Sequence, residues 1–175
     1  MRHKHRYREI HQQESGNTVD ADHRSLMAMA NNFARRSNCV RRAVGAVIVR
    51  QGQVIAAGWN GVSASYRDCR EAGCPRCIEG GDTGSGYETC ICIHAEQSAI
   101  AEAAKRGLST KDSIMYVNLR PCLQCLAIAK ASGVREIYYG GENWNYSDEV
   151  EKVYRALSDQ FESFIHVAEA DYAVS

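Results

Sequence analysis

The chain has 175 residues, a length that favours one domain with a hydrophobic core of ordinary size. Its 21 lysine and arginine residues balance 21 aspartate and glutamate residues, so its formal net charge of zero gives no general attraction to nucleic acid or to a membrane surface. The longest apolar runs, such as Ala43–Val49, are too short to cross a bilayer, and no apolar signal-peptide core follows the basic N-terminus. We therefore expect a cytoplasmic protein that binds neither nucleic acid nor membranes.

The N-terminal third predicts a tail, a helix and a hairpin. Residues 1–18 are polar and basic without any period, which is typical of a flexible tail, and residues 19–175 then form a single domain. Asp20 and Asp22 are candidate caps for a helix that continues to about residue 37. Two runs rich in β-branched residues, 43–49 and 54–59, flank a Gln-Gly turn and predict paired strands.

Residues 60–92, which we call the insert, are rich in cysteine and show no helical or strand period. A loop of this length in a compact domain is usually functional or held by something. The spacing Cys69-x4-Cys74-x2-Cys77, followed by Cys90-x-Cys92, predicts a second, structural zinc site. Disulfides are the alternative, although a reducing compartment disfavours them.

Helices and strands alternate after the insert. The expected elements are a helix over 94–106, a strand over 113–118, a helix over 122–131, a strand over 134–139, a helix over 149–158 and a final strand over 164–167. Strands joined by helical crossovers are parallel. The sum is an α/β fold with three layers, α/β/α, and a mixed five-stranded sheet. The loop after residue 140 carries Trp144 and Tyr146, which could either contact a ligand or cover the core.

Two motifs carry the chemistry, an H-x-E sequence at His94–Glu96 and a P-C-x-x-C sequence at Pro121–Cys125. His94, Cys122 and Cys125 offer three metal ligands, and a catalytic zinc site uses three protein ligands and leaves one position open. Helix N-termini favour thiolates, and both motifs lie where a helix begins. Zinc lowers the pKa of a bound water to about 7, and Glu96 beside it acts as acid and base. A purely structural zinc site is the alternative, but it would close with a fourth ligand.

At these positions the chain resembles the deoxycytidylate (dCMP) deaminase family, which has the cytidine deaminase-like fold. The resemblance covers roughly residues 24–150. The matching stretches are Arg36–Cys39, Val44–Val49, Gly58–Gly61, His94–Glu96, Pro121–Cys125 and Ala131–Val134, together with the cysteine-rich pieces Gly73–Cys77 and Cys90–Cys92.

The resemblance implies hydrolysis of dCMP to dUMP and ammonia, with Glu96 moving the proton. It places the backbone N–H of Ala95 at the pyrimidine O2 and Asn60 at the sugar, and it assigns Ser98 to the nucleotide site. Lys105 lies near a family position that is basic in some members, so it could either help bind the phosphate or be a solvated lysine on a helix face. It implies one catalytic zinc and a structural zinc held by Cys39, Cys69 and Cys92, with Cys74, Cys77 or Cys90 as the fourth ligand. It also implies a homo-oligomer, a hexamer or a dimer, and regulation by dCTP and dTTP.

The chain departs from the family pattern where Ser98 replaces an asparagine and where Val62–Ser65 replaces a proline-containing sequence. Because buried polar contacts determine which substrate is accepted, these departures leave other reactions open. The alternatives are a deaminase of another amino-heterocycle, a tRNA adenosine deaminase, or a zinc-stabilised binding protein without catalytic activity. The neutral charge argues against the second alternative, and the intact Glu96 argues against the third.

Overall fold

A computed structural model describes residues 21–63, 66–71, 73–80, 87–141 and 146–172. The predicted tail over 1–18, the candidate cap Asp20 and the loop residue Trp144 lie outside the described residues. Within the described residues, none of the helices combines the length and the apolar character that a membrane span requires.

The centre of the molecule is a mixed five-stranded sheet, as predicted. Its strands, in the spatial order β2-β1-β3-β4-β5, are β2 (Gln53–Trp59), β1 (Gly45–Arg50), β3 (Ser113–Val117), β4 (Val134–Tyr139) and β5 (Ser163–His166). Strand β1 runs antiparallel to both β2 and β3, whereas β3, β4 and β5 are parallel to one another. Parallel neighbours need crossover connections, and the helices between these strands supply them.

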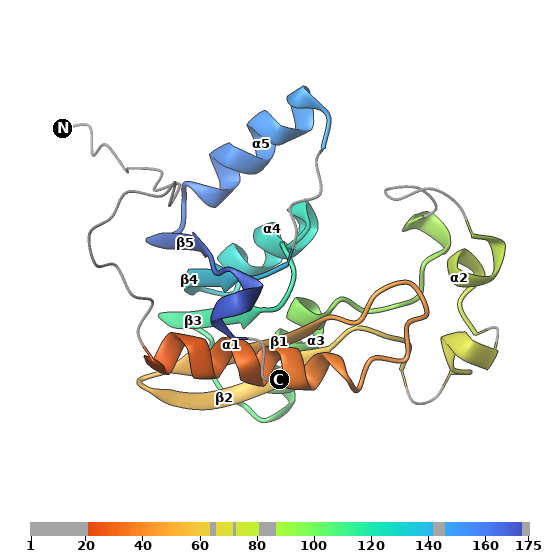
Figure 1. Ribbon diagram of the computed structural model, residues 1–175, viewed down its shortest axis with the longest axis horizontal. Helices are drawn as coiled ribbons and strands as arrows, with labels where there is room; N and C mark the ends of the chain where they lie inside the picture. The colour runs from red at the N-terminus through yellow and green to blue at the C-terminus, as the bar shows by residue number, and fades with distance from the viewer. Residues whose placement is uncertain (1–20, 64–65, 72, 81–86, 142–145, 173–175) are drawn as a thin grey trace.

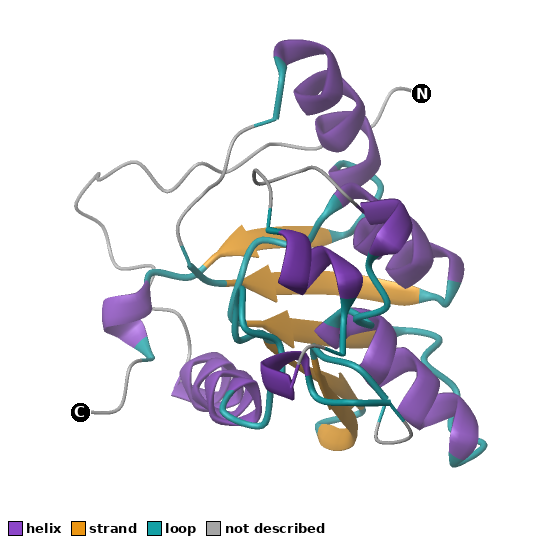
Figure 2. Cartoon of the chain, turned by 90° about the vertical axis from the view of Figure 1, so that its right-hand side faces the viewer, coloured by secondary structure: helices purple, strands orange, loops and turns teal. Residues whose placement is uncertain are grey.

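Helices cover both faces of the sheet (Figures 1 and 2). Helix α1 (Ala21–Ala34) packs on one face, while α3 (Ala95–Lys105) and α4 (Leu123–Ala131) pack on the other, with α5 (Asp148–Ser158) against α4. Alternate residues of the central strands serve the two faces: Val47 packs with the α1 cluster and Ile48 with the α3–α4 cluster. The predicted three-layer α/β/α arrangement is therefore confirmed.

Helix α1 begins at Ala21, so Asp22 lies in its first turn instead of capping it. The helix ends at Ala34, earlier than predicted, because Ser37 donates its backbone N–H to the Ala34 carbonyl in a turn. The remaining predicted elements are present, with bounds that differ by one or two residues.

Close packing of β2 on α3 depends on Gly58. A Cβ atom at this position would lie 2.3 Å from the backbone nitrogen of Ala99 and 2.6 Å from the carbonyl oxygen of Ala95. Only glycine allows this approach without moving the backbone. Strand β2 thus fixes the first turns of α3, the helix that follows the H-x-E histidine.

The insert extends beyond one end of the sheet, on the right of Figure 1. It contains the short helix α2 (Pro75–Glu79) and two single-turn 3₁₀ segments, η1 (Cys69–Glu71) and η2 (Tyr87–Thr89). A third 3₁₀ segment, η3 (Glu169–Asp171), lies outside the insert and follows β5. A small cluster of buried residues (Val62, Cys69 and Cys74) replaces a conventional apolar core there. These few buried side chains do not offset the conformational entropy lost when a segment of this length becomes ordered. Another interaction therefore has to hold the insert.

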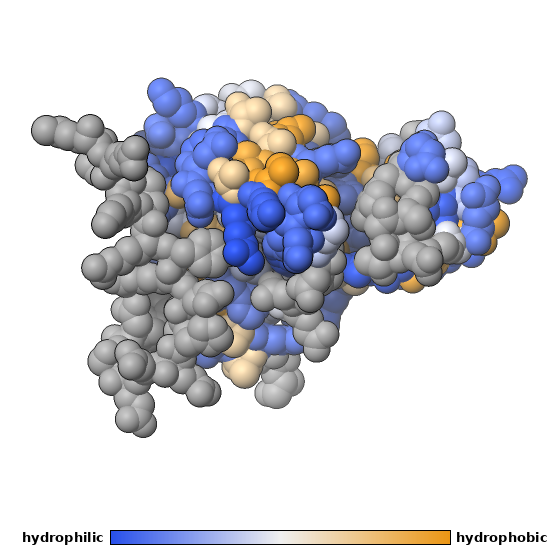
Figure 3. Space-filling view, turned by 90° about the horizontal axis from the view of Figure 1, so that it is seen from above, coloured by the Kyte–Doolittle hydropathy of each residue, from blue (hydrophilic) through white to orange (hydrophobic). Residues whose placement is uncertain are grey.

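The surface on the side that carries α5 in Figure 1 is mostly hydrophilic, with one apolar area near its centre (Figure 3). Helix α5 begins with acidic residues in its first turn, where they interact favourably with the helix dipole, and its side chain Tyr154 is buried. One face of α5 thus packs against α4 while the opposite face meets water.

Candidate functional site

Two helices begin at the same place in the structure. His94 precedes α3 and Cys122 precedes α4, both in extended conformation, with φ and ψ of −74° and 156° for His94 and of −78° and 166° for Cys122. The backbone N–H of His94 donates to the side-chain oxygen of Gln97 at 3.1 Å, which closes the first turn of α3. The H-x-E and P-C-x-x-C motifs, 28 residues apart in sequence, therefore meet at two helix N-termini.

His94, Cys122 and Cys125 come together as the sequence predicts. The Nδ1 atom of His94 lies 3.4 Å from the Cys122 sulfur and 3.3 Å from the Cys125 sulfur, and all three donor atoms lie within 4.8 Å of one another. Three such ligands on a tetrahedral zinc ion would be separated by roughly 3.6 Å, given metal–ligand bonds of about 2.0–2.3 Å. The donor set therefore fits a tetrahedral cation, which would keep one position for a further ligand.

The charges of this group suit a cation. Hydrogen bonding from the Cys125 thiol lowers the pKa of Cys122 to about 4. Hydrogen bonding with the Cys122 sulfur raises the pKa of His94, although burial of the ring opposes this. The same sulfur raises the pKa of the Cys125 thiol. These shifts favour the thiolate form of Cys122, which is the form that binds metal.

Glu96 lies beside this group, with 4% of its surface exposed. Burial raises the pKa of its carboxyl group to about 6, and the negative charge of Cys122 acts in the same direction. Its carboxylate also interacts with the Cys125 thiol. A carboxyl group in this environment can both accept and release a proton near neutral pH.

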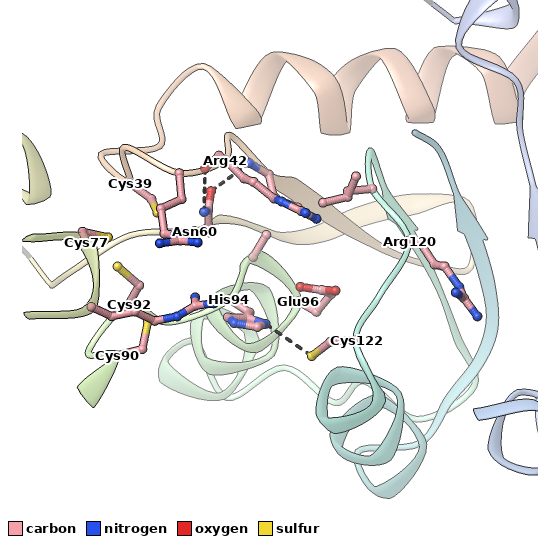
Figure 4. A pocket seen from close by; sticks show the side chains of 15 residues that line it. Cys39, Arg42, Asn60, Cys77, Cys90, Cys92, His94, Glu96, Arg120 and Cys122 are labelled. Atoms are coloured by element: carbon pink, nitrogen blue, oxygen red, sulfur yellow. Dashed lines mark hydrogen bonds between the residues drawn. The ribbon is translucent and has the colours of Figure 1, made fainter. Parts of the chain in front are cut away.

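A cavity of about 110 Å³ opens above these residues. His94, Ala95, Glu96 and Cys122 form one part of its lining, and Asn60 forms another (Figure 4). Its walls also contain four arginine residues: Arg41, Arg42, Arg76 and Arg120. Motif reasoning did not single out the arginines, although each lies within three residues of a cysteine.

Asn60 is in the cavity lining, but its side-chain amide forms hydrogen bonds with the backbone of a neighbouring segment. Its oxygen accepts the N–H of Val44 at 2.7 Å, and its nitrogen donates to the carbonyl of Arg42 at 2.8 Å. With 7% of its surface exposed, Asn60 braces the segment that carries Arg41 and Arg42.

The structure does not bring Ser98 and Lys105 to the cavity lining. Ser98 is half-buried in α3, and Lys105 is exposed at the far end of that helix, where it pairs with Glu102 at 3.9 Å. Nine residues of helix separate Lys105 from Glu96, a rise of about 14 Å at 1.5 Å per residue. A phosphate near the cavity would therefore lie far from Lys105.

Four sulfur atoms form a second group. Those of Cys69, Cys74, Cys77 and Cys92 lie within 4.8 Å of one another, and Cys69 and Cys92 are 3.3 Å apart. All eight cysteines are free thiols, so the structure contains none of the disulfides considered above. Four thiols at one point are the donor set of a closed, structural zinc site.

This group differs from the ligand set that the family resemblance implied. Cys39 and Cys90 line the cavity but are not part of the four-sulfur group, in which Cys74 and Cys77 both take part. The reason is local: Cys74 precedes α2 and its carbonyl accepts the N–H of Cys77 at 3.0 Å, so both sulfurs lie on one side of a helical turn.

A buried polar cluster supports the cysteines of the P-C-x-x-C motif, and sequence analysis missed it. It consists of Arg120, Tyr146, Glu151 and Tyr154, and we call it the Arg120 cluster. Arg120 forms a two-point ion pair with Glu151 at 2.9 and 3.0 Å and lies 4.0 Å from the centre of the Tyr154 ring. The Tyr154 hydroxyl donates to the Pro121 carbonyl at 3.0 Å, and the Tyr146 hydroxyl accepts the N–H of Leu123 at 3.0 Å. These bonds hold the backbone on both sides of Cys122.

Comparison with known proteins gives a consistent result. Residues 20–141 match the model of the cytidine and deoxycytidylate deaminase zinc-binding region. The deoxycytidylate deaminase of Schizosaccharomyces pombe is 36% identical over 80% of this chain and 43% of its own length, and that of Mycobacterium phage D29 is 33% identical over 67% of this chain and 93% of its own. The chain thus spans about two fifths of the length of the fungal relatives it matches.

A solved structure agrees with these matches. The dCMP deaminase of cyanophage S-TIM5, in complex with dCMP and dUMP, aligns with a TM-score of 0.59 and 29% identity over 78% of this chain and 92% of the phage chain. Fold and ligand set together define a protein with the cytidine deaminase-like fold and its zinc-binding region. Within that class, the chain belongs to the deoxycytidylate deaminase family, as the sequence motifs predicted.

Proposed function

We propose that the protein catalyses the hydrolytic deamination of a cytosine nucleotide, converting dCMP and water to dUMP and ammonia. The observation that carries the proposal is a buried carboxylate, Glu96, beside the donor group of His94, Cys122 and Cys125 at an open cavity. The identity to deoxycytidylate deaminases over most of the chain supports the same substrate.

His94, Cys122 and Cys125 would hold the catalytic zinc. When bound, zinc supplies Lewis acidity, which lowers the pKa of a water molecule enough to make it a nucleophile at neutral pH. His94, Glu96 and Cys122 line the cavity that would receive the cytosine ring.

Glu96 would carry the protons. Its carboxylate accepts a proton from the attacking water and delivers it to N3 of the base, and a second transfer to the exocyclic nitrogen allows ammonia to leave. Because Glu96 is almost fully buried, water does not compete for these protons. The backbone N–H of Ala95, in the first turn of α3, lacks an intrahelical acceptor and is available for the pyrimidine O2.

The experiment is ammonia release from dCMP, CMP, deoxycytidine and dCTP by the zinc-loaded protein, with Glu96→Gln as the test variant. We expect dCMP to be the preferred substrate and Glu96→Gln to lose at least about 10³-fold in kcat, with zinc content and circular dichroism unchanged, since a positioned acid/base is worth about 10²–10⁴-fold per proton transfer. Turnover of Glu96→Gln at the wild-type rate, or release of ammonia from none of the four compounds, would contradict the proposal.

Further predictions from the sequence belong to this proposal. The four-sulfur group of Cys69, Cys74, Cys77 and Cys92 would hold a structural zinc ion that orders the insert. A single domain over 19–175, a homo-oligomer, regulation by dCTP and dTTP, and a cytoplasmic location stay predictions.

A further inference from the structure

The loop between α1 and β1, residues 35–44, forms the wall of the cavity that lies across from His94 and Glu96 (Figure 4). It supplies four of the lining residues: Cys39, Arg41, Arg42 and Val44. None of residues 35–44 belongs to a helix or a strand. The shape of this wall therefore depends on hydrogen bonds between the loop and other segments.

Asn38 links the start of the loop to the start of the insert. Its side-chain oxygen accepts the backbone N–H of Val62 at 2.9 Å, and its side-chain nitrogen donates to the Val62 carbonyl at 3.3 Å. One amide thus pairs with both backbone groups of a residue that is 8% exposed. The approach is close, because a Cβ atom on Gly61 would lie 2.0 Å from the Asn38 oxygen. Only glycine fits there without a shift of the amide.

The same segment is also bonded to the residue before His94. Gly61 and Ile93 exchange backbone hydrogen bonds of 2.8 and 3.1 Å in an antiparallel bridge. Val62 is therefore held by the Asn38 amide, and the preceding residue is held by Ile93. A continuous path of hydrogen bonds joins the loop wall to the backbone that carries His94.

Asn38 is the link at the beginning of the loop, since Asn60 holds the loop's other end through Arg42 and Val44. Asn38 is not among the described residues that line the cavity, so it acts through this path and not by touching a substrate. A misplacement of about 1 Å between reacting groups can cost about 10²-fold in rate. A contact that fixes the separation of the two walls therefore bears on catalysis.

We propose that Asn38 is a positioning residue for the deamination, which keeps the loop wall and His94 at a fixed separation across the cavity. This inference rests on the proposed function, in which His94 holds the catalytic zinc. It extends that function to a side chain outside the cavity, and it gives the hydrogen bonds between loop, insert and His94 a role in turnover as well as in folding.

The first test compares kcat and KM for dCMP in wild type and Asn38→Ala, at saturating zinc and well below the Tm of each protein. We expect kcat to fall by at least about tenfold, because the two walls lose their fixed separation. A merely structural role would lower the Tm and leave the kcat of the folded protein unchanged. An unchanged kcat, or a change in KM alone, would therefore overturn the inference.

Gly61→Ala gives a second test, in which the link is forced apart instead of deleted. The added Cβ displaces the Asn38 amide from Val62, so kcat should again fall by about tenfold. In the Asn38→Ala background the obstructing oxygen is absent, and adding Gly61→Ala should then cost less than about threefold. Equal fold-losses in the two backgrounds would show that the residues act independently and would reject the path.

Asn32→Ala is the matched control, since Asn32 is an exposed asparagine of α1 outside the cavity lining. It should leave kcat and KM within about twofold of wild type. Circular dichroism and zinc content report whether each variant is folded. If Asn38→Ala does not fold, Asn38→Asp replaces it, because aspartate keeps the acceptor for the Val62 N–H and loses the donor. Its kcat should fall by about threefold or more, and an unchanged kcat overturns the inference.

Failure of this inference differs from failure of the proposed function. Wild-type turnover of dCMP with an unaffected kcat in Asn38→Ala overturns the positioning role and leaves the deaminase proposal intact. A wild-type protein that releases ammonia from none of dCMP, CMP, deoxycytidine and dCTP contradicts the proposed function, and the inference falls with it.

Discussion

Replacement of Glu151 by glutamine tests whether the Arg120 cluster holds the metal ligands. Glu151 is 18% exposed and makes both hydrogen bonds of the pair with the buried Arg120. Removing one partner of a buried pair costs about 3–5 kcal/mol. Because glutamine keeps one acceptor and water reaches part of the site, we expect a loss of about 2 kcal/mol. For a chain of this size that corresponds to a fall in Tm of about 4–8 °C.

The second expected effect is on the metal. The cluster binds the backbone at Pro121 and Leu123, on either side of Cys122. Side chains that support metal ligands in this way typically change metal affinity by about 10–100-fold when they are removed. Zinc release to a chelator should therefore be at least about tenfold more favourable in Glu151→Gln. Urea unfolding at fixed zinc concentration and chelator competition measure the two effects.

Glu149→Gln is the control, since Glu149 is an exposed carboxylate in the same turn of α5. It should change the free energy of unfolding by less than about 1 kcal/mol, through the helix dipole alone. Equal effects of the two substitutions on stability and zinc release would refute the role of the cluster.

The pair also predicts a pH dependence. Hydrogen bonding from Arg120 lowers the pKa of Glu151 below its ordinary value. A carboxyl group with a lowered pKa contributes its full stabilisation above the unfolded-state pKa, which is about 4.3 for glutamate, and loses it as the pH falls through the lower folded-state value. The difference in stability between wild type and Glu151→Gln should therefore be constant above about pH 5 and shrink in acid.

Three further predictions, two of them with a matched control substitution, test the remaining parts of the structure. Cys74→Ser should remove about one zinc ion per chain, whereas Cys39→Ser, outside the four-sulfur group, should retain both by metal analysis; equal zinc loss would return Cys39 to the ligand set. Gly58→Ala should lower the free energy of unfolding, measured in urea, by about 3 kcal/mol, because the new Cβ would lie 2.3 Å from the α3 backbone. Gly107→Ala is the control: this glycine has a positive φ but open space around it, so the loss should be about 1 kcal/mol. Lys105→Ala should leave kcat/KM for dCMP within about twofold, and a tenfold loss would restore its predicted phosphate role.

The sequence predicted most of the fold because its local signals agree with one another. Strand residues alternate between two apolar faces, as Val47 and Ile48 show, and helices begin where His94 and Pro121–Cys122 suggest. The main errors lie at element ends, such as the early end of α1, where the helical hydrogen bonds give way to three-residue turns.

The site was predicted as far as spacing determines it. Within the H-x-E and P-C-x-x-C motifs, the spacing at the start of a helix determines which side chains lie side by side. The sequence therefore correctly identified four neighbours: His94, Glu96, Cys122 and Cys125. The Arg120 cluster could not be found in this way, because Arg120 and Glu151 are 31 residues apart and neither lies in a metal-binding motif. Cys39, which the resemblance includes in the ligand set, lies outside the four-sulfur group. Which cysteines meet depends on how the insert folds back, and a pattern of spacings leaves several combinations open.

The two halves of the catalytic ligand set are held by different parts of the molecule. Upstream, Cys92 belongs to the four-sulfur group, and Ile93 exchanges two backbone hydrogen bonds with Gly61, of 2.8 and 3.1 Å, directly before His94. Downstream, the Arg120 cluster holds the turn that carries Cys122. Because both halves also depend on contacts that are distant in sequence, we expect the ligand set to be complete only when the insert and α5 are both in place, so that metal binding and folding are coupled. Damage to the insert should therefore release His94 from the metal site, whereas damage to α5 should release the two cysteines.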